Sequence, residues 1–157
     1  MTRYSKLEKA LGTSFYDKSL LEQALIHSSF VNENPVAARR SNERLEFLGD
    51  AVLGMVIAED LYHRKAEASE GELTRLRGSI VCGTTLAEIA QSIDLGEHLY
   101  MGKGEEANGG RSRMTNLAGA VESVIGAVFI DQGYQTSKDC ILKLFQPEIE
   151  RALQRKT

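Results

Sequence analysis

Tryptophan is absent from this chain of 157 residues, and aromatic side chains make up only 6% of it. Cysteine is nearly as scarce, because Cys82 and Cys140 are too few for the disulfide framework of a small secreted protein. The first residues carry no apolar signal segment, and no stretch has the length and apolar character of a membrane span. We therefore expect a soluble protein of the reduced cytoplasm with no membrane partner.

A surplus of either charge is also lacking. The formal net charge is −3, so a polyanionic partner would have to be met by local basic clusters or by bound cations. Hydrophobic residues at 42% and charged residues at 26% are ordinary for one globular domain. No internal repeat, low-complexity tract or interdomain linker divides the chain. We expect one domain over residues 1–150 and a solvated tail over residues 151–157.

Regular alternation of apolar and polar residues is missing, whereas helix-start patterns recur. Ser/Thr-x-x-Glu motifs that precede apolar residues at helical spacing predict capping boxes at Ser5, Ser19, Ser69 and Thr85. Residues 30–41 and 101–113 are expected to be polar loops. A further helix is predicted from Thr115 to Ile130, and a last one begins near Thr136 and is interrupted or restarted by Pro147. The predicted fold class is all-α.

Residues 41–54 open the longest helical pattern and carry the carboxylates Glu43, Glu46 and Asp50, with Ser41 as a good N-cap. At about 100° per residue, the three acids lie within roughly a 60° arc of one helix face. The helix then becomes apolar nearly all round, which is typical of a buried helix. Because buried carboxylates are rare unless paired or bound to a cation, this face is a candidate metal site.

A further acid, Glu122, stands alone in the apolar stretch 117–130, so its charge must be neutralised from elsewhere. One interpretation is an ion pair with a basic side chain, for which the candidates are Arg44, Arg75 and Arg77. The other is that two acidic helix faces together supply the oxygen ligands that Mg²⁺ prefers. A magnesium site of that kind suits phosphodiester hydrolysis. The residues alone leave both interpretations open.

The stretch Asn42-Glu-Arg-Leu-Glu-Phe-Leu-Gly-Asp50 resembles the signature of the ribonuclease III endonuclease domain. Other segments resemble that domain in order and spacing, and they are residues 27–30, 69–77, 102–111 and 117–133. The likeness covers nearly all of residues 5–150. It implies an all-α homodimer that cleaves double-stranded RNA with Mg²⁺, or with Mn²⁺ as the alternative ion, and uses no organic cofactor. It also implies 5′-phosphate products with staggered 3′ ends and a role such as ribosomal RNA processing.

The same resemblance assigns roles by position. Glu46, Asp50 and Glu122 would be the metal ligands, with Asp50 and Glu122 the pair most directly tied to catalysis. Glu43 and Glu70 match accessory acids near the cleft.

Phe47 matches a residue that packs across the dimer. Duplex RNA is recognised mainly through its backbone and shape, which makes several basic residues candidate phosphate contacts. These are Arg39, Arg40, Lys103, Arg111 and Arg113. The three histidines, His27, His63 and His98, have no metal-ligand spacing and are expected to be structural or exposed, and both cysteines are expected to be buried.

Two features depart from the family pattern. Gly119 stands three residues before Glu122, where the family usually has an aspartate, so one carboxylate ligand is missing. Asn116 lies one turn earlier on the helix and is a poor substitute. The chain also stops where the typical bacterial enzyme continues toward a double-stranded-RNA-binding domain, so we expect no such domain here.

Three hypotheses follow for the function. The first is a dimeric, Mg²⁺-dependent endoribonuclease that cuts duplex RNA. The second is a ribonuclease III fold that binds RNA or a ribonucleoprotein with weakened or silenced cleavage, which Gly119 favours. The third is a purely structural helical dimer, favoured by the low net charge. Two separate acidic helix faces argue against the third hypothesis, because they would reduce stability without a metal.

Overall fold

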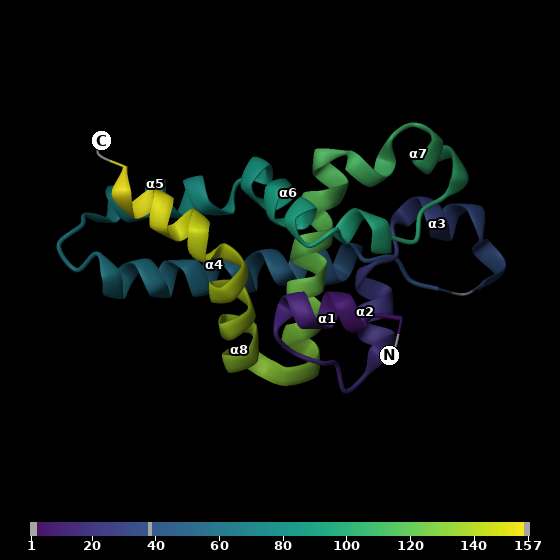
Figure 1. Cartoon of the computed structure of the whole chain (residues 1–157), viewed down its shortest axis with the longest axis horizontal. Helices are drawn as coiled ribbons and strands as arrows, with labels where there is room; N and C mark the ends of the chain where they lie inside the picture. Colours follow the sequence, from purple (N-terminus) through teal and green to yellow (C-terminus); the bar gives the residue numbers. More distant parts are fainter. Residues whose placement is uncertain (1–2, 38, 156–157) are drawn as a thin grey trace.

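Two long helices, α4 (Glu43–Arg64) and α8 (Met114–Gln154), cross in the middle of the molecule and make its most extensive helix contact (Figure 1). The computed structural model describes residues 3–37 and 39–155. The other α-helices are α1 (Ser5–Leu11), α2 (Lys18–Ala24), α3 (Ser28–Glu33), α5 (Glu70–Val81), α6 (Gly83–Ser92) and α7 (Lys103–Ala107). Short 3₁₀ turns are η1 (Pro35–Ala37), η2 (Leu95–His98) and η3 (Gly110–Ser112). Within these described ranges there is no strand, only an isolated bridge between Ile26 and Tyr100, so the all-α prediction is confirmed.

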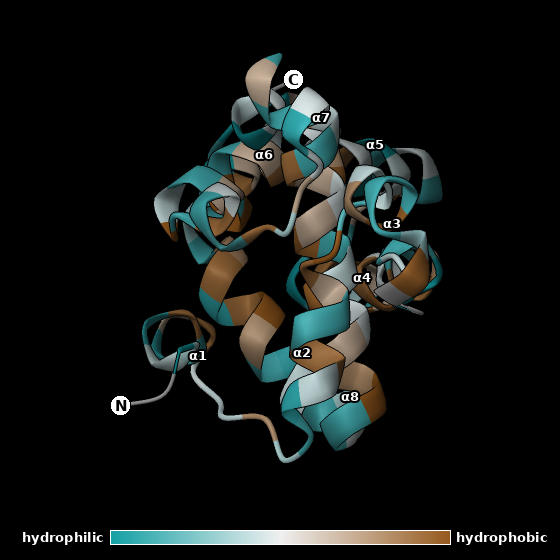
Figure 2. Ribbon diagram, turned by 90° about the vertical axis from the view of Figure 1, so that its right-hand side faces the viewer, coloured by the Kyte–Doolittle hydropathy of each residue, from teal (hydrophilic) through white to brown (hydrophobic). Residues whose placement is uncertain are grey.

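Glycine brings α4 and α8 into backbone contact where they cross. A Cβ on Gly49 would lie 1.6 Å from the carbonyl oxygen of Glu122, and a Cβ on Gly126 would lie 2.3 Å from the carbonyl oxygen of Leu45. No larger residue fits at either position without moving a backbone. Around the crossing, α4 buries Leu45, Val52, Leu53 and Val56, and Figure 2 shows hydrophobic, brown ribbon on α4 and α8. The crossing therefore fixes the two helices that carry the predicted acids.

The helix α8 changes direction at Gly133, whose φ of 84° and ψ of −172° are not helical. This agrees with the predicted break between Ile130 and Thr136. Past the break, the chain returns beside α5 (Figure 1). The predicted interruption at Pro147 is wrong: the helix continues through it, and the proline lies on the exposed side, where its ring leaves the core undisturbed.

The predicted solvated tail over residues 151–157 is only partly solvated among the described residues, because it is helical to Gln154 and buries Ala152. The last helical segment reaches Gln154, and Phe145, Ile149 and Ala152 are buried along one face. Their spacing of four and three residues is that of one helix stripe, so this segment belongs to the core. Residues 156 and 157 lie outside the described part of the chain.

By length and composition, α8 passes the test for a membrane span, contrary to expectation, with a mean hydropathy of 1.3 over its most apolar window. Of that window, 61% is buried inside the fold. The core helix of a globular domain has the same apolar character when it is surrounded by other helices. Its packing against α4 accounts for this apolar sequence without a membrane.

Of the predicted capping boxes, only the one at Ser69 has the expected cap, since its side chain accepts a hydrogen bond of 3.2 Å from the Glu72 N–H. The cap of α2 is Asp17, two residues before the predicted Ser19. Thr85 lies inside α6 and is buried. Ser/Thr-x-x-Glu therefore located the helices but not their first residues. The two predicted loops are partly helical, since they contain the end of α3, η1, α7 and η3.

Candidate active site

A buried polar clamp sets the position of the first turn of α4. The Asn42 side chain is 7% exposed and donates from Nδ2 to the Ala24 carbonyl oxygen at 3.2 Å. The Ser123 hydroxyl donates to the same oxygen at 2.6 Å. Since Ser123 follows Glu122 on α8 and Asn42 precedes Glu43 on α4, the end of α2 aligns both acidic helices. Ser123 was not predicted as a functional residue. The signal that could have identified it is a serine inside the mostly apolar stretch 117–130.

Asp50 and Glu122 meet at the crossing of the two helices. A hydrogen bond joins their side chains, and the pKa of Glu122 is raised to about 8. Burial is the largest cause, followed by the hydrogen bond to Asp50 and then by the negative charges of Asp50 and Glu46. At neutral pH the Glu122 carboxyl therefore keeps its proton and donates it toward Asp50. The structure thus brings together the two acids that the sequence placed on different helices.

Glu46 stands one helical turn before Asp50, against the bare α-carbon of Gly119. A Cβ built at Gly119 would lie 2.9 Å from Glu46 Oε2 and 3.1 Å from Glu46 Oε1. Burial raises the pKa of Glu46, the charges of Glu43 and Asp50 raise it further, and His27 opposes them. Glu46 is therefore part of the same negatively charged neighbourhood as Glu122.

The alternative that Glu122 is neutralised by an arginine is not supported. Among the described residues, no ion pair joins Glu122 to any of the three candidate arginines, Arg44, Arg75 and Arg77. No cation contributes to the shifted pKa of Glu122 either. Its charge is removed by a proton instead, which is what an acid cluster does when no cation is bound.

The donor set suits a hard divalent cation by its chemistry. Carboxylate oxygens are the ligands that Mg²⁺ prefers, and a cation would replace the proton that Glu122 now holds. Over residues 3–37 and 39–155, no group of three or more His, Cys, Asp or Glu side chains is already arranged to hold an ion. Asp50 and Glu122 are in contact and Glu46 faces Gly119, so these three carboxyls are the ones that would hold such an ion.

The accessory acids lie in different places. Glu43 is exposed in the first turn of α4, where the Ser41 hydroxyl donates to its Oε1 at 3.0 Å. Ser41 is not the terminal cap of α4, which is Asn42, although its hydroxyl also accepts from the Glu43 N–H at 3.3 Å. Glu70 starts α5 and lines a hollow of about 290 Å³ with Ala58, Leu61, Tyr62, Leu73, Thr74 and Arg77. That hollow is at the C-terminal half of α4, so one chain does not bring Glu70 to the Asp50–Glu122 pair.

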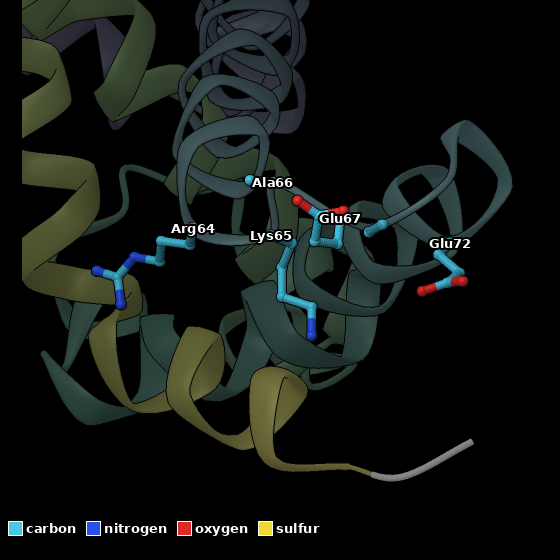
Figure 3. Close-up of a pocket in the computed structure, with 6 residues that line it drawn as sticks. Arg64, Lys65, Ala66, Glu67 and Glu72 are labelled. Atoms are coloured by element: carbon cyan, nitrogen blue, oxygen red, sulfur yellow. The ribbon is translucent and has the colours of Figure 1, made fainter.

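Another hollow, of about 420 Å³, lies at the connection between α4 and α5 and is shown in Figure 3. It is lined by charged and small residues, which are Arg64, Lys65, Ala66, Glu67, Ala68 and Glu72. In Figure 3, Arg64 points away from the other labelled side chains, and its Nη1 lies 3.2 Å from Oε1 of Glu150 on α8. This hollow is at the opposite end of α4 from the acids and is not part of their site.

Phe47 lies on the outer side of α4, between Glu46 and Asp50, and is 82% exposed. Met55 and Tyr62 continue the same face and are 60% and 68% exposed. Their spacings of eight and seven residues are each close to two helical turns, so the three lie on the same side of α4 and form one apolar stripe. Isolated apolar residues on a surface are ordinary, whereas a stripe of large exposed ones is typical of contact surfaces.

Some of the predicted phosphate contacts already form hydrogen bonds or ion pairs within the chain, whereas others are exposed to solvent. Arg111 donates to the carbonyl oxygens of Gly96 and Leu99 at 3.0 and 2.7 Å, so its guanidinium holds η2 in place. Arg113 pairs with Glu105 at 2.9 Å, and Arg39 pairs with Glu22. In the described part of the chain, Arg40 and Lys103 are exposed and form no ion pair.

A hollow of about 310 Å³ borders the N-terminal end of α4 and carries several of these basic residues. Arg39, Arg40 and Arg44 line it together with Glu43, and the rest of its wall is Gln23, Ser28, Val31, Asn32 and Ser41. Local positive charge is therefore present next to the acidic helix, although the chain as a whole is slightly negative.

His27 connects three segments near the site, a role that its spacing did not reveal. Its Nε2 lies 2.9 Å from Asn116 Oδ1, and its Nδ1 lies 2.7 Å from the Ser29 hydroxyl. Asn116 in turn donates to Glu105 Oε2 at 3.2 Å and to the Gly110 carbonyl oxygen at 3.0 Å. The expected structural role of His27 is confirmed, and the network ties α3 and the α7–η3 segment to the first turn of α8.

The two cysteines differ from each other, contrary to expectation. Cys140 is buried as expected, but Cys82 is exposed, because it lies between α5 and α6 rather than inside a helix. Its pKa is lowered, first by the hydrogen bond from the Thr85 hydroxyl and then by a backbone N–H of the next helix.

Fold and site together define a helical domain in which two crossing helices bring the carboxyls of Asp50 and Glu122 into contact. The sequence model described as ribonuclease-III-like matches residues 17–149, and the chain belongs to that family. It is 50% identical to Ribonuclease 3 of Dehalococcoides mccartyi (strain ATCC BAA-2266 / KCTC 15142 / 195) over 151 residues, which are 96% of this chain and 64% of that protein. It is 47% identical to Ribonuclease 3 of Pelotomaculum thermopropionicum over 148 residues, which are 94% of this chain and 61% of that protein. The chain thus spans less than two thirds of the length of these relatives.

Solved structures show the same fold. The nuclease domain of ribonuclease III from Campylobacter jejuni superposes with a TM-score of 0.85 at 39% identity, covering 100% of both chains. A second structure of that domain, described as flexible in a region involved in dimer formation, gives a TM-score of 0.86 at 41% identity over 92% of this chain and 97% of the other. Dicer from Pichia stipitis matches at a TM-score of 0.66 and 26% identity, covering 89% of this chain and 59% of Dicer. The predicted ribonuclease III endonuclease fold is confirmed.

Proposed function

We propose that this chain is the endonuclease domain of a divalent-metal-dependent endoribonuclease that cleaves double-stranded RNA in the cytoplasm. The observation that carries this proposal is the Asp50–Glu122 pair, whose excess negative charge is met by a proton and by no basic side chain. The family of the chain and the names of its relatives support the same activity. We extend the proposal to 5′-phosphate products with staggered 3′ ends and to RNA processing, including that of ribosomal RNA.

Glu46, Asp50 and Glu122 would hold Mg²⁺, or Mn²⁺ in its place. When bound, such an ion supplies an activated water and stabilises charge on the phosphate oxygens. The chain itself contributes the fixed crossing at Gly49 and Gly126, which keeps the acids of α4 and α8 at a constant separation. Glu122 is partly buried whereas Asp50 is exposed, so their electrostatic interaction is stronger than it would be between two fully exposed carboxyls.

The basic hollow beside Glu43 is proposed to meet the RNA backbone. Arg40 and Arg44 line it, and Lys103 is exposed on α7. Contacts of this type recognise phosphate and helix shape rather than sequence, as expected for duplex RNA. We keep Arg39, Arg111 and Arg113 as candidates of lower rank, because each already pairs with an acid of this chain.

A homodimer formed through the apolar stripe on α4 is part of the proposal. Phe47, Met55 and Tyr62 are too exposed for a face that stays in water, and the hollow of about 290 Å³ beside Tyr62 offers a place for an aromatic ring of a second copy. Such a dimer would also explain Glu70, because only a second copy can carry that acid to an Asp50–Glu122 pair. The related Campylobacter domain is described as having a dimer-forming region.

The test is cleavage of an end-labelled RNA duplex by the purified chain, with Mg²⁺ or with a chelator, beside Glu122→Gln. We expect cutting by the parent only with the ion, and a loss of about a thousandfold or more in Glu122→Gln with the fold retained. Cutting by Glu122→Gln at the parent rate would remove Glu122 from the catalytic pair. Duplex binding without any cutting by the parent would favour the second hypothesis, a binding module with a silenced site, for which Gly119 is the specific observation.

A further inference from the structure

An acid of α3 holds the beginning of α7. Glu33 is the last residue of α3, and its Oε1 accepts the Lys103 N–H at 2.9 Å, while its Oε2 accepts the Gly104 N–H at 3.2 Å. N–H groups in the first turn of a helix have no acceptor within that helix. The two hydrogen bonds lower the pKa of Glu33, so the carboxyl is charged at neutral pH. One carboxylate thus satisfies two donors that α7 cannot satisfy itself.

A second contact from α3 supports the same junction. The Ser29 hydroxyl accepts the Gly102 N–H at 2.9 Å. A Cβ on Gly102 would lie 2.7 Å from the Ser29 carbonyl oxygen, so the two main chains approach this closely only because residue 102 is a glycine. In Figure 1, α3 and α7 lie side by side. With five residues, α7 is too short to be stable without contacts to the rest of the fold, so its placement depends on α3.

Lys103 is the basic residue of α7, and the other charged residues of this helix are both acids. Glu105 pairs with Arg113 at 2.9 Å. Glu106 pairs with Arg111 at 2.8 Å. Lys103 is exposed, and over the described ranges of the chain no ion pair includes it. The positive charge that α7 offers to a phosphate is therefore that of Lys103.

We propose that Glu33 is a positioning residue for RNA, which holds the first turn of α7 so that the Lys103 ammonium meets a phosphate of the duplex. This inference rests on the proposed binding of double-stranded RNA. It assigns to an acid a contribution in favour of binding a polyanion. By its charge alone, a carboxylate near a phosphate weakens binding, because like charges repel. The sign of the effect therefore separates positioning from simple electrostatics.

The test titrates a labelled RNA duplex with the whole purified chain, by fluorescence anisotropy in a chelator at several salt concentrations. Glu33→Ala should weaken binding by about fivefold and lower the slope of log affinity against log salt concentration by about one, as the loss of a phosphate contact does. Glu33→Gln removes the same charge but keeps a carbonyl oxygen as an acceptor, so it should weaken binding less. Glu67→Ala is the matched control. This exposed acid lies at the connection between α4 and α5, and its removal should leave the affinity unchanged or raise it slightly.

A double variant tests whether Glu33 acts through Lys103. Lys103→Ala alone should weaken binding by about fivefold or more, and adding Glu33→Ala should then change the affinity by less than about twofold. With Mg²⁺ and cleavage as the readout, Glu33→Ala should raise KM by about the factor that it loses in affinity and keep kcat within about twofold. A partly unfolded chain would instead lower kcat at an unchanged KM. Circular dichroism checks that each variant is folded.

Stronger or parent-like binding in Glu33→Ala would overturn the inference, and so would additive effects of the two substitutions or a parent that binds no duplex. If Glu33→Ala does not fold, Glu33→Gln decides, since a loss of affinity in it supports the inference and parent-like affinity rejects it. Cleavage is recorded separately. A parent that binds the duplex with the expected pattern of variants but does not cut it rejects the proposed endonuclease and leaves this inference standing.

Discussion

Gly49 touches the main chain of Glu122, so closely that a Cβ on Gly49 would lie 1.6 Å from the Glu122 carbonyl oxygen. The residue that allows the two helices to meet is thus in contact with a residue of the proposed metal site. The close contact that packs α4 against α8 also positions Glu122. A substitution at Gly49 therefore disturbs the helix crossing while leaving every carboxylate of the site in the sequence.

Gly49→Ala should destabilise the fold by about 3 kcal/mol or more, because one of the two helices must shift. For a domain of this size we expect the melting temperature to fall by roughly 10 °C, measured by circular dichroism. Gly78→Ala, in an open part of α5, should change it little or raise it slightly. Equal melting temperatures for the two variants would show that the α4–α8 crossing is looser than described.

Without metal, the free energy of unfolding should depend on pH because Glu122 titrates at a different pH in the folded and the unfolded chain. Its pKa is about 8 in the folded chain and close to 4.3 in the unfolded chain, so between these values the folded state binds the extra proton. Stability is therefore greatest below the lower pKa and decreases as the pH rises through the higher one. Because the group is only half buried, we expect a loss of about 1–2 kcal/mol.

Urea midpoints measured in a chelator at pH 6 and pH 9 test this effect. Glu122→Gln cannot titrate, so the difference between parent and variant isolates this one carboxyl from other ionising groups. The parent should lose more stability than the variant over this range, and added Mg²⁺ should restore it at pH 9. Parallel curves for parent and variant would contradict the assignment.

Phe47→Ala should weaken self-association by about tenfold or more, because a large aromatic ring that becomes buried at an interface contributes strongly to its affinity. Sedimentation at a series of protein concentrations gives the dissociation constant. Tyr16→Ala is the matched control, since Tyr16 is 87% exposed but lies between α1 and α2, away from the stripe. A parent that is monomeric throughout, or equal effects of both substitutions, would reject the α4 interface.

Arg40→Ala and Arg111→Ala should have different consequences although both arginines were predicted to contact RNA. Arg111 donates to the carbonyl oxygens of Gly96 and Leu99, so its loss should reduce stability by about 1–3 kcal/mol. Arg40→Ala should leave the melting temperature unchanged and weaken duplex binding, with a shallower salt dependence. Unchanged duplex binding in Arg40→Ala would remove this arginine from the interface.

Cys82 and Cys140 should react with iodoacetamide at rates that differ by about tenfold or more near pH 7.5. Cys82 is exposed, and the hydrogen bond from Thr85 lowers its pKa, whereas Cys140 is 4% exposed and burial raises its pKa to about 11. Peptide mass spectrometry identifies the labelled thiol, and Cys82→Ser is the control. Equal labelling of both thiols in the folded chain would contradict their different surroundings.

The sequence predicted the all-α fold and the two acidic helices because both depend on local periodicity. Residues 43–64 and 114–132 repeat their apolar positions at helical spacing, and acids within such apolar stretches are conspicuous. Periodicity could not predict the direct contact of Asp50 with Glu122, because spacing along a chain does not show which helices cross. Ser123 and Asn42 were missed for the same reason. Neither residue stands out in the sequence, and only the structure shows that both side chains donate to the Ala24 carbonyl oxygen.

Helix ends were predicted less well than helices. Thr85 and Ser19 fit the capping pattern but lie inside helices, because Cys82 and Asp17 precede them and start those helices instead. The error at the C-terminal end has a different source. The charged residues of 151–155 suggested solvent, whereas the buried Ala152 between them continues the stripe of Phe145 and Ile149.

The buried clamp of Asn42, Ala24 and Ser123 has a consequence for the order of folding. Its hydrogen bonds join positions separated by 18 and 99 residues along the chain, so they form only after the loops between them have closed. Individual helices can gain their structure earlier, from local contacts alone. The carboxylates thus come together late, and a partly folded chain keeps its acids apart in water. Ion affinity would then be a property of the finished native state alone, and its recovery during refolding would follow the slowest long-range step.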